Sequence, residues 1–126
     1  MGSDLRQLDA EVAECLGWHE TKCGSWVDKD GLVQVVCHTF EPSIVAKDCE
    51  AVKAEIRKRV LENRWSFTMD YVKTMNESGS WECWARVLID TPKPGTHGMA
   101  LSMTEYEAIC RAYVAAAKGG QHVESM

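Results

Sequence analysis

A chain of 126 residues, of which 45% are hydrophobic and 26% charged, has the size and composition of one globular domain, and this excludes disorder as its main state. Its formal net charge of −5 argues against binding to duplex nucleic acid, because such proteins present a basic surface to the phosphates. No window approaches the roughly 18 consecutive apolar residues of a membrane-spanning helix, and the N-terminus has no signal-peptide pattern. We therefore expect a cytoplasmic protein without membrane contact.

The first half of the chain predicts a helix, a hairpin and a second helix. Apolar residues recur at helical spacing up to Gly17, which is placed to end the first helix. The stretch 26–40 has Asp28-Lys-Asp-Gly31 between apolar pieces, which is typical of a β-hairpin turn. Pro42-Ser43 then opens a long amphipathic helix, with Ser43 as its expected N-cap.

The next stretch predicts a second hairpin. Hydrophobic and polar residues alternate over 65–73, the sequence Asn76-Glu-Ser-Gly79 turns the chain, and residues 83–89 form a strong second strand. The segment Thr91–Gly98 contains two prolines and two glycines, which predicts a long loop.

A final helix follows this loop. Ser102-Met-Thr-Glu105 matches a capping box, so we expect the helix to begin there. The predicted order is α-β-β-α-β-β-α, an α+β fold in which an antiparallel sheet of two hairpins is packed against helices in a compact sandwich. Residues 1–118 are expected to form this single domain and residues 119–126 a flexible C-terminal tail.

The six cysteines are predicted to be free thiols. Five fall on apolar helix stripes or in strands, where cysteine behaves as a small hydrophobic residue: Cys15, Cys37, Cys49, Cys83 and Cys110. The sixth, Cys23, lies beside Gly24 in a polar segment and is the one expected to be exposed. No C-x-x-C pair occurs, so neither a zinc ribbon nor a thioredoxin-type pair is supported.

Two sequence strings carry a resemblance to a known family. They are Val12-Ala-Glu-Cys-Leu-Gly-Trp18 and Glu107-Ala-Ile-Cys-Arg-Ala112, accompanied by Pro42-Ser43 and by Trp65-x-Phe67. Together they resemble the phage ABA-sandwich domain, a family of small bacteriophage and prophage proteins. The resemblance implies a phage origin and a layered fold of helices and sheet, and it brings no catalytic site. The Thr91–Gly98 segment is longer than the corresponding link in that family.

No motif commits the chain to catalysis. Of the zinc deaminase signature only His122-Val-Glu124 is present, without the cysteine pair. Cys37 and His38 are strand neighbours and point to opposite faces, so they cannot form a nucleophile–base pair. An enzyme that uses Cys23 with His19 is the least favoured alternative, and we predict a protein without enzymatic activity, metal or cofactor.

One candidate ligand site lies on the strand 83–89. Trp84 and Arg86 share one strand face, and an aromatic ring beside a guanidinium suits a nucleobase with a nearby phosphate. The alternative, which we favour, is that Trp84 packs under a helix and Arg86 pairs with Asp70 across the hairpin.

Two further candidate sites are basic. Five cations fall between positions 53 and 64, where they either grip a phosphate or form a solvated helix face: Lys53, Arg57, Lys58, Arg59 and Arg64. The loop with Lys93 and His97 is either a lid over a ligand or a tolerated surface insertion.

Five tryptophans are many for a domain of this size. Trp18 and Trp65 are expected to be structural, whereas Trp26, Trp81 and Trp84 are expected at a surface, where aromatic residues mark partner sites. Self-association would bury them, so we expect a homo-oligomer, with Trp26 and Trp81 at the interface.

These observations favour a protein that acts by binding. The first hypothesis is a phage accessory protein that counters host defence in the host cytoplasm. It would either sequester a small anionic signal such as a cyclic nucleotide or mask a host protein. The alternative is an oligomeric interaction module that has no ligand.

Overall fold

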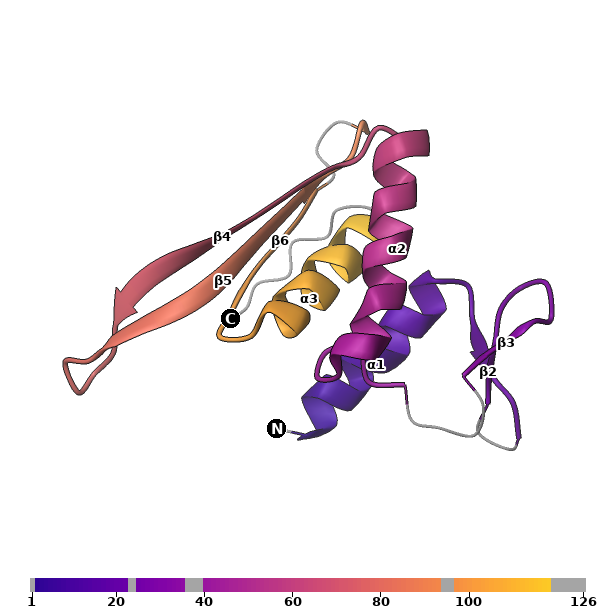
Figure 1. The fold of residues 1–126 in the computed structure, drawn as a ribbon, viewed down its shortest axis with the longest axis horizontal. Helices are drawn as coiled ribbons and strands as arrows, with labels where there is room; N and C mark the ends of the chain where they lie inside the picture. The colour runs from indigo at the N-terminus through magenta and orange to yellow at the C-terminus, as the bar shows by residue number, and fades with distance from the viewer. Residues whose placement is uncertain (1, 23–24, 36–39, 94–96, 119–126) are drawn as a thin grey trace.

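The computed structural model describes residues 2–22, 25–35, 40–93 and 97–118 (Figure 1). Helix α1 (Gly2–Cys15) is followed by three short strands, β1 (His19–Glu20), β2 (Trp26–Val27) and β3 (Val33–Val35), which pair as a small antiparallel sheet. The second half contains helix α2 (Ala46–Glu62), strands β4 (Ser66–Met75), β5 (Trp81–Asp90) and β6 (His97–Ser102), and helix α3 (Glu105–Ala117).

The α+β class is therefore confirmed, with two antiparallel sheets of three strands in the described part of the chain instead of one sheet built from two hairpins. The two predicted turns are present. Asp28 Oδ1 accepts the backbone N–H groups of Asp30 and Leu32, both at 2.9 Å, and Asn76 Oδ1 accepts that of Ser80 at 2.9 Å. These side chains satisfy turn amides that no strand pairs, as is usual for Asp and Asn.

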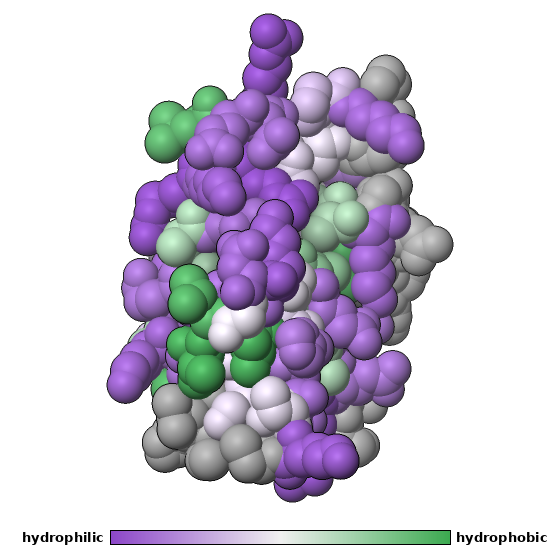
Figure 2. Space-filling view, turned by 90° about the vertical axis from the view of Figure 1, so that its right-hand side faces the viewer, coloured by the Kyte–Doolittle hydropathy of each residue, from purple (hydrophilic) through white to green (hydrophobic). Residues whose placement is uncertain are grey.

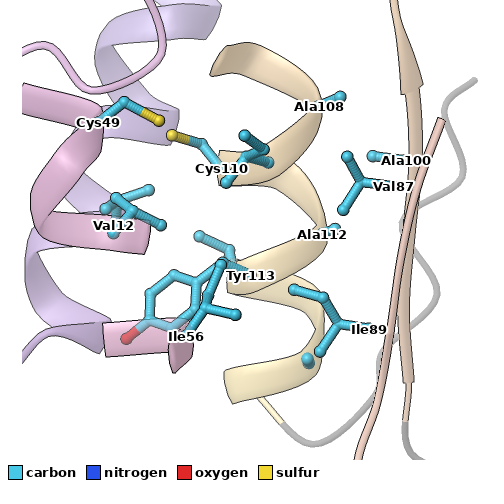
Figure 3. Close-up of a cluster of buried hydrophobic side chains, with 14 of the residues drawn as sticks. Val12, Cys49, Ile56, Val87, Ile89, Ala100, Ala108, Cys110, Ala112 and Tyr113 are labelled. Carbon is cyan, nitrogen blue, oxygen red and sulfur yellow. The ribbon is translucent and has the colours of Figure 1, made fainter. Parts of the chain in front are cut away.

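Helix α3 is the centre of the hydrophobic core. It lies between the β4–β5–β6 sheet on one side and helices α1 and α2 on the other (Figures 1 and 3). Its sheet-facing side is built from alanines such as Ala108 and Ala112, while Tyr113 points toward the other helices and donates a hydrogen bond to the Cys15 carbonyl at 3.1 Å. Eight residues of α3 are buried, which explains why this helix is apolar on almost every side.

A close approach between β6 and α3 depends on Gly98. A Cβ atom at this position would lie 2.0 Å from the Ala112 carbonyl oxygen and 2.8 Å from the Ala116 nitrogen. The residue before it in the chain, His97, begins β6, so the last two positions of the predicted loop 91–98 belong to a strand. The prediction of a loop over the whole segment was wrong, because a glycine that permits close packing has the same sequence signal as one that breaks a strand.

Both predicted helix starts are shifted. Helix α2 begins at Ala46 after Val45, which provides no side-chain cap, and the expected cap Ser43 is instead buried three residues before it. The Ser43 N–H donates to the buried Asp9 carboxylate at 3.0 Å, which ties this turn to α1. At α3 the N-cap is Thr104, whose hydroxyl accepts the Glu107 N–H at 3.4 Å, and the capping box at Ser102 does not form.

The β4–β5 hairpin extends beyond the rest of the domain. Strand β6 ends opposite Ala85, so residues 72–84 form a two-stranded ribbon that projects past the helices (Figure 1). We call these residues the arm. Within the described part of the chain, no helix is long and apolar enough to cross a membrane.

Candidate functional site

A charged cavity of about 600 Å³ lies where the end of α2 meets the segment after β5 and the end of α3. Its ionisable lining residues are four cations and two acids, Lys29, Lys58, Arg59, Lys93, Glu55 and Glu62. The cations come from three separate segments: the β2–β3 turn, α2 and the segment that follows β5. We call this site the cationic cavity, since its lining is positive although the whole chain is acidic.

The wall of the cationic cavity is held in place by contacts to Arg59. The guanidinium lies 4.8 Å from the centre of the Trp65 ring, and its Nε donates to Glu55 at 2.8 Å. Trp65 is 7% exposed and packs against Tyr113, with 6.3 Å between ring centres. This buried tryptophan confirms the structural role expected for it, and it anchors a cation at the cavity wall by a cation–π contact.

The remaining cations differ in how they are engaged. Lys29 and Lys58 form no ion pair with any residue that the structure describes. An amine without a carboxylate partner keeps its full charge available for a bound anion. Arg59 shares its charge with Glu55, so the electrostatic attraction of the cavity depends mainly on Lys29 and Lys58.

Two candidate features that are separate in the sequence therefore meet here. Lys58 and Arg59 belong to the basic run 53–64, and Lys93 belongs to the segment after β5. Lys29 was missed, because a lysine in a hairpin turn has no pattern that places it near α2.

Other basic candidates lie elsewhere. Arg57 borders an apolar groove between α2 and β4 and lies 4.0 Å from Glu50. Arg64 follows α2 with φ +61° and is exposed, and His97 begins β6 opposite Asp90. None of these three lines the cationic cavity, and because Arg57 and Arg64 lie apart from Lys58 and Arg59, the basic run does not act as one surface.

The Trp84 and Arg86 pair lies on the sheet face opposite α3. Arg86 donates two hydrogen bonds to Asp70, at 2.9 and 2.5 Å, which confirms the cross-strand pairing. This bond to Arg86 lowers the pKa of Asp70. The expectation that Trp84 packs under a helix was wrong: α3 covers the face that carries Ala85 and Val87, whereas Trp84 is half-buried on the other face and donates to Glu82 at 3.1 Å. With its guanidinium occupied by Asp70, Arg86 is a weaker phosphate contact than the cavity lysines.

The other tryptophans divide between core and surface. Trp26 is half-buried, with its ring centre 6.5 Å from that of Phe40, and Trp18 lies against the same ring at 4.9 Å. Trp26 therefore packs on the core. Trp81 is 58% exposed on the arm, as expected for a surface tryptophan.

The described cysteines are free thiols. Cys49 and Cys110 are buried as predicted, and their sulfur atoms point toward each other between α2 and α3 (Figure 3). The hydrogen bond with Cys49, together with burial, raises the pKa of Cys110. Cys83 was expected in the core but is exposed, because its part of β5 belongs to the arm, which α3 does not cover. Cys23 and Cys37 lie outside the described residues.

The side of the molecule that carries α2 and the small sheet is mainly hydrophilic, with hydrophobic side chains in a few small groups (Figure 2). Among the described residues, no three His, Cys, Asp or Glu side chains are grouped to hold a metal ion. No protein-family model, curated protein or solved structure matches the chain. The resemblance to the phage ABA-sandwich domain stays a prediction.

Proposed function

We propose that the protein is a binding module for a small phosphate-bearing ligand of the nucleotide class, held in the cationic cavity. The observation that carries this proposal is the convergence of Lys29, Lys58 and Lys93 with Arg59 in one cavity of an acidic protein. A volume of about 600 Å³ lies within the range of roughly 300–1,000 Å³ typical of small-molecule sites. Phosphate oxygens accept charge-assisted hydrogen bonds from such cations.

In this proposal the protein acts by sequestration. A phage accessory protein that binds a cyclic nucleotide in the host cytoplasm would remove the signal from a host defence pathway without any chemistry. The phage origin rests on the sequence resemblance, and the choice of an anionic ligand rests on the cavity. Masking of a host protein is the competing form of the same role.

Thermal unfolding with mono-, di- and cyclic nucleotides and with inorganic phosphate tests the proposal. A ligand at 100 times its dissociation constant adds about 2.7 kcal/mol to the free energy of unfolding. The entropy of unfolding is about 2.1 cal/mol/K per residue, so 126 residues give a rise in Tm of about 10 °C.

A pair of charge reversals on α2 locates the site. Lys58→Glu should abolish the ligand-induced rise in Tm, because it places a carboxylate in the cavity. Lys47→Glu makes the same change of net charge about 16 Å away along the helix and should leave the rise unchanged. Equal responses of the two variants, or no rise in Tm with any of these compounds, would refute the proposal.

A further inference from the structure

The arm exposes large apolar side chains that nothing in the described chain covers. On the face that α3 covers further along the sheet, Met75 and Trp81 are 56% and 58% exposed, and Tyr71 at the base of the arm is 55% exposed. Lys73 lies on the same face, with its amine 4.6 Å from the centre of the Trp81 ring. A two-stranded ribbon is only marginally stable in water by itself, so packing against a further surface would stabilise it.

A groove of about 580 Å³ lies at the base of the arm, where β4 and β5 meet the start of α3. Its walls are mainly apolar and aromatic, with two carboxylates: Leu5, Ile44, Tyr71, Met103, Glu105 and Glu107. We call this site the acidic groove. It lies at the N-terminal end of α3, about 18 Å along this helix from the end that borders the cationic cavity, so the two sites are separate.

The charges of the acidic groove and of the arm are complementary. Glu107 pairs with Arg111 at 2.7 Å, but Glu105 accepts only the neutral hydroxyl of Tyr71. Glu105 has no cation partner among the described residues, and Lys73 has no carboxylate partner among them. The arm thus offers a cation stacked on an exposed tryptophan, and the groove offers an unpaired carboxylate between apolar walls.

At its base the arm contributes Cys83 to the groove of its own chain, but Lys73, Met75 and Trp81 do not line that groove. Tyr71 lines the groove, and the strand continues away from it, so Lys73 and Met75 lie progressively farther along the ribbon. In a second copy related by a two-fold axis the arm runs in the reverse direction, and a suitably placed axis lets each arm lie against the groove of the other chain.

We propose that the protein forms a symmetric homodimer in which the arm of each copy lies in the acidic groove of the other, with Lys73 of one chain beside Glu105 of its partner. Both complementary surfaces occur on the same chain, and one two-fold axis uses each of them once per chain. Trp81 and Met75 are covered in this arrangement together with the apolar groove walls around Met103. The cationic cavity has no part in it, so the dimer stands or falls independently of the proposed ligand.

Sedimentation velocity and light scattering measure the expected dimer, with twice the monomer mass of 14.1 kDa. Lys73→Glu gives a chain with carboxylates at positions 73 and 105. Glu105→Lys gives a chain with amines at the same two positions. Each variant alone faces like charges across the interface and should be monomeric. Their equimolar mixture should form a heterodimer, because every contact between residues 73 and 105 again joins opposite charges.

Glu77→Lys, in the exposed turn of the arm, is the matched control and should remain dimeric. Should Glu105→Lys fail to give the circular dichroism spectrum of the wild type, Glu105→Gln replaces it. This variant loses two ion pairs per dimer and should raise the dissociation constant about two- to thirtyfold. The proposal would be overturned if the wild-type protein stays monomeric when its concentration is raised 100-fold above that of the first sedimentation run. The proposal would also be overturned if neither Lys73→Glu nor the change at Glu105 weakens the dimer. A mixture of the two folded charge-reversed variants that stays monomeric would overturn it as well.

Discussion

Replacing Gly98 by alanine tests the packing of α3 on the sheet. The added Cβ would lie 2.0 Å from the Ala112 carbonyl oxygen, which is 1.4 Å short of the 3.4 Å at which ordinary van der Waals contact begins. The obstructing atoms are backbone, so relief requires α3 to move away from β6. That movement would loosen the contacts of Ile89 and Val87 with α3, since these buried side chains fill the same interface.

Overpacking of a core costs about 1–3 kcal/mol, and we expect Gly98→Ala to cost about 3 kcal/mol because a central helix must shift. At about 0.26 kcal/mol/K for 126 residues, this loss lowers Tm by about 11 °C. Differential scanning calorimetry measures the change directly.

Gly79→Ala is the control for this experiment. It has open space around the new Cβ but a φ of +87°, so strain alone should cost about 1 kcal/mol and about 4 °C. If Gly98→Ala melts within 2 °C of the wild type, the close approach of β6 and α3 does not constrain the fold.

Three further predictions concern buried groups. Burial raises the pKa of the Asp9 carboxyl above its ordinary value of 3.8. Ionisation of Asp9 therefore destabilises the folded state progressively as pH rises from 3.8 through the folded pKa. The stability of Asp9→Asn relative to the wild type, measured by urea unfolding, should increase between pH 4 and pH 7. A relative stability that does not change with pH would contradict this. Alkylation followed by mass spectrometry should modify the exposed Cys83 before the buried Cys49 and Cys110, and simultaneous modification would contradict the burial of the latter pair. Tyr113→Phe leaves a backbone carbonyl without its donor and should cost about 1–2 kcal/mol in the free energy of unfolding; an unchanged value would show that this bond contributes nothing.

Periodicity identified the elements that have a strong local signal. Spacing and turn chemistry, which act over a few residues, predicted the three helices and the turns at Asp28 and Asn76. The turn at Asn76 sets the hairpin that pairs Asp70 with Arg86. The predicted starts of the helices were less accurate. Ser43 is a residue type that commonly caps a helix, but its backbone N–H instead donates a tertiary hydrogen bond to Asp9.

The candidate site was predictable only in pieces. The basic run and the segment containing Lys93 were visible in the sequence, but no local pattern shows that Lys58 and Lys93 border the same cavity, which depends on how α2 packs beside the strands. The exposure of Cys83 was also not predictable, since it depends on where α3 ends relative to the length of the hairpin.

The central position of α3 has a consequence for synthesis on the ribosome. This helix follows every other described element in the chain, yet it supplies the surface that both the sheet and the two earlier helices bury. While α3 is still inside the exit tunnel, the apolar faces of the emerged segments have no common surface to cover them. A nascent chain in this condition is open to aggregation or chaperone binding. The native core is therefore expected to form only after α3 has left the tunnel, and a chain truncated before residue 105 should not form it.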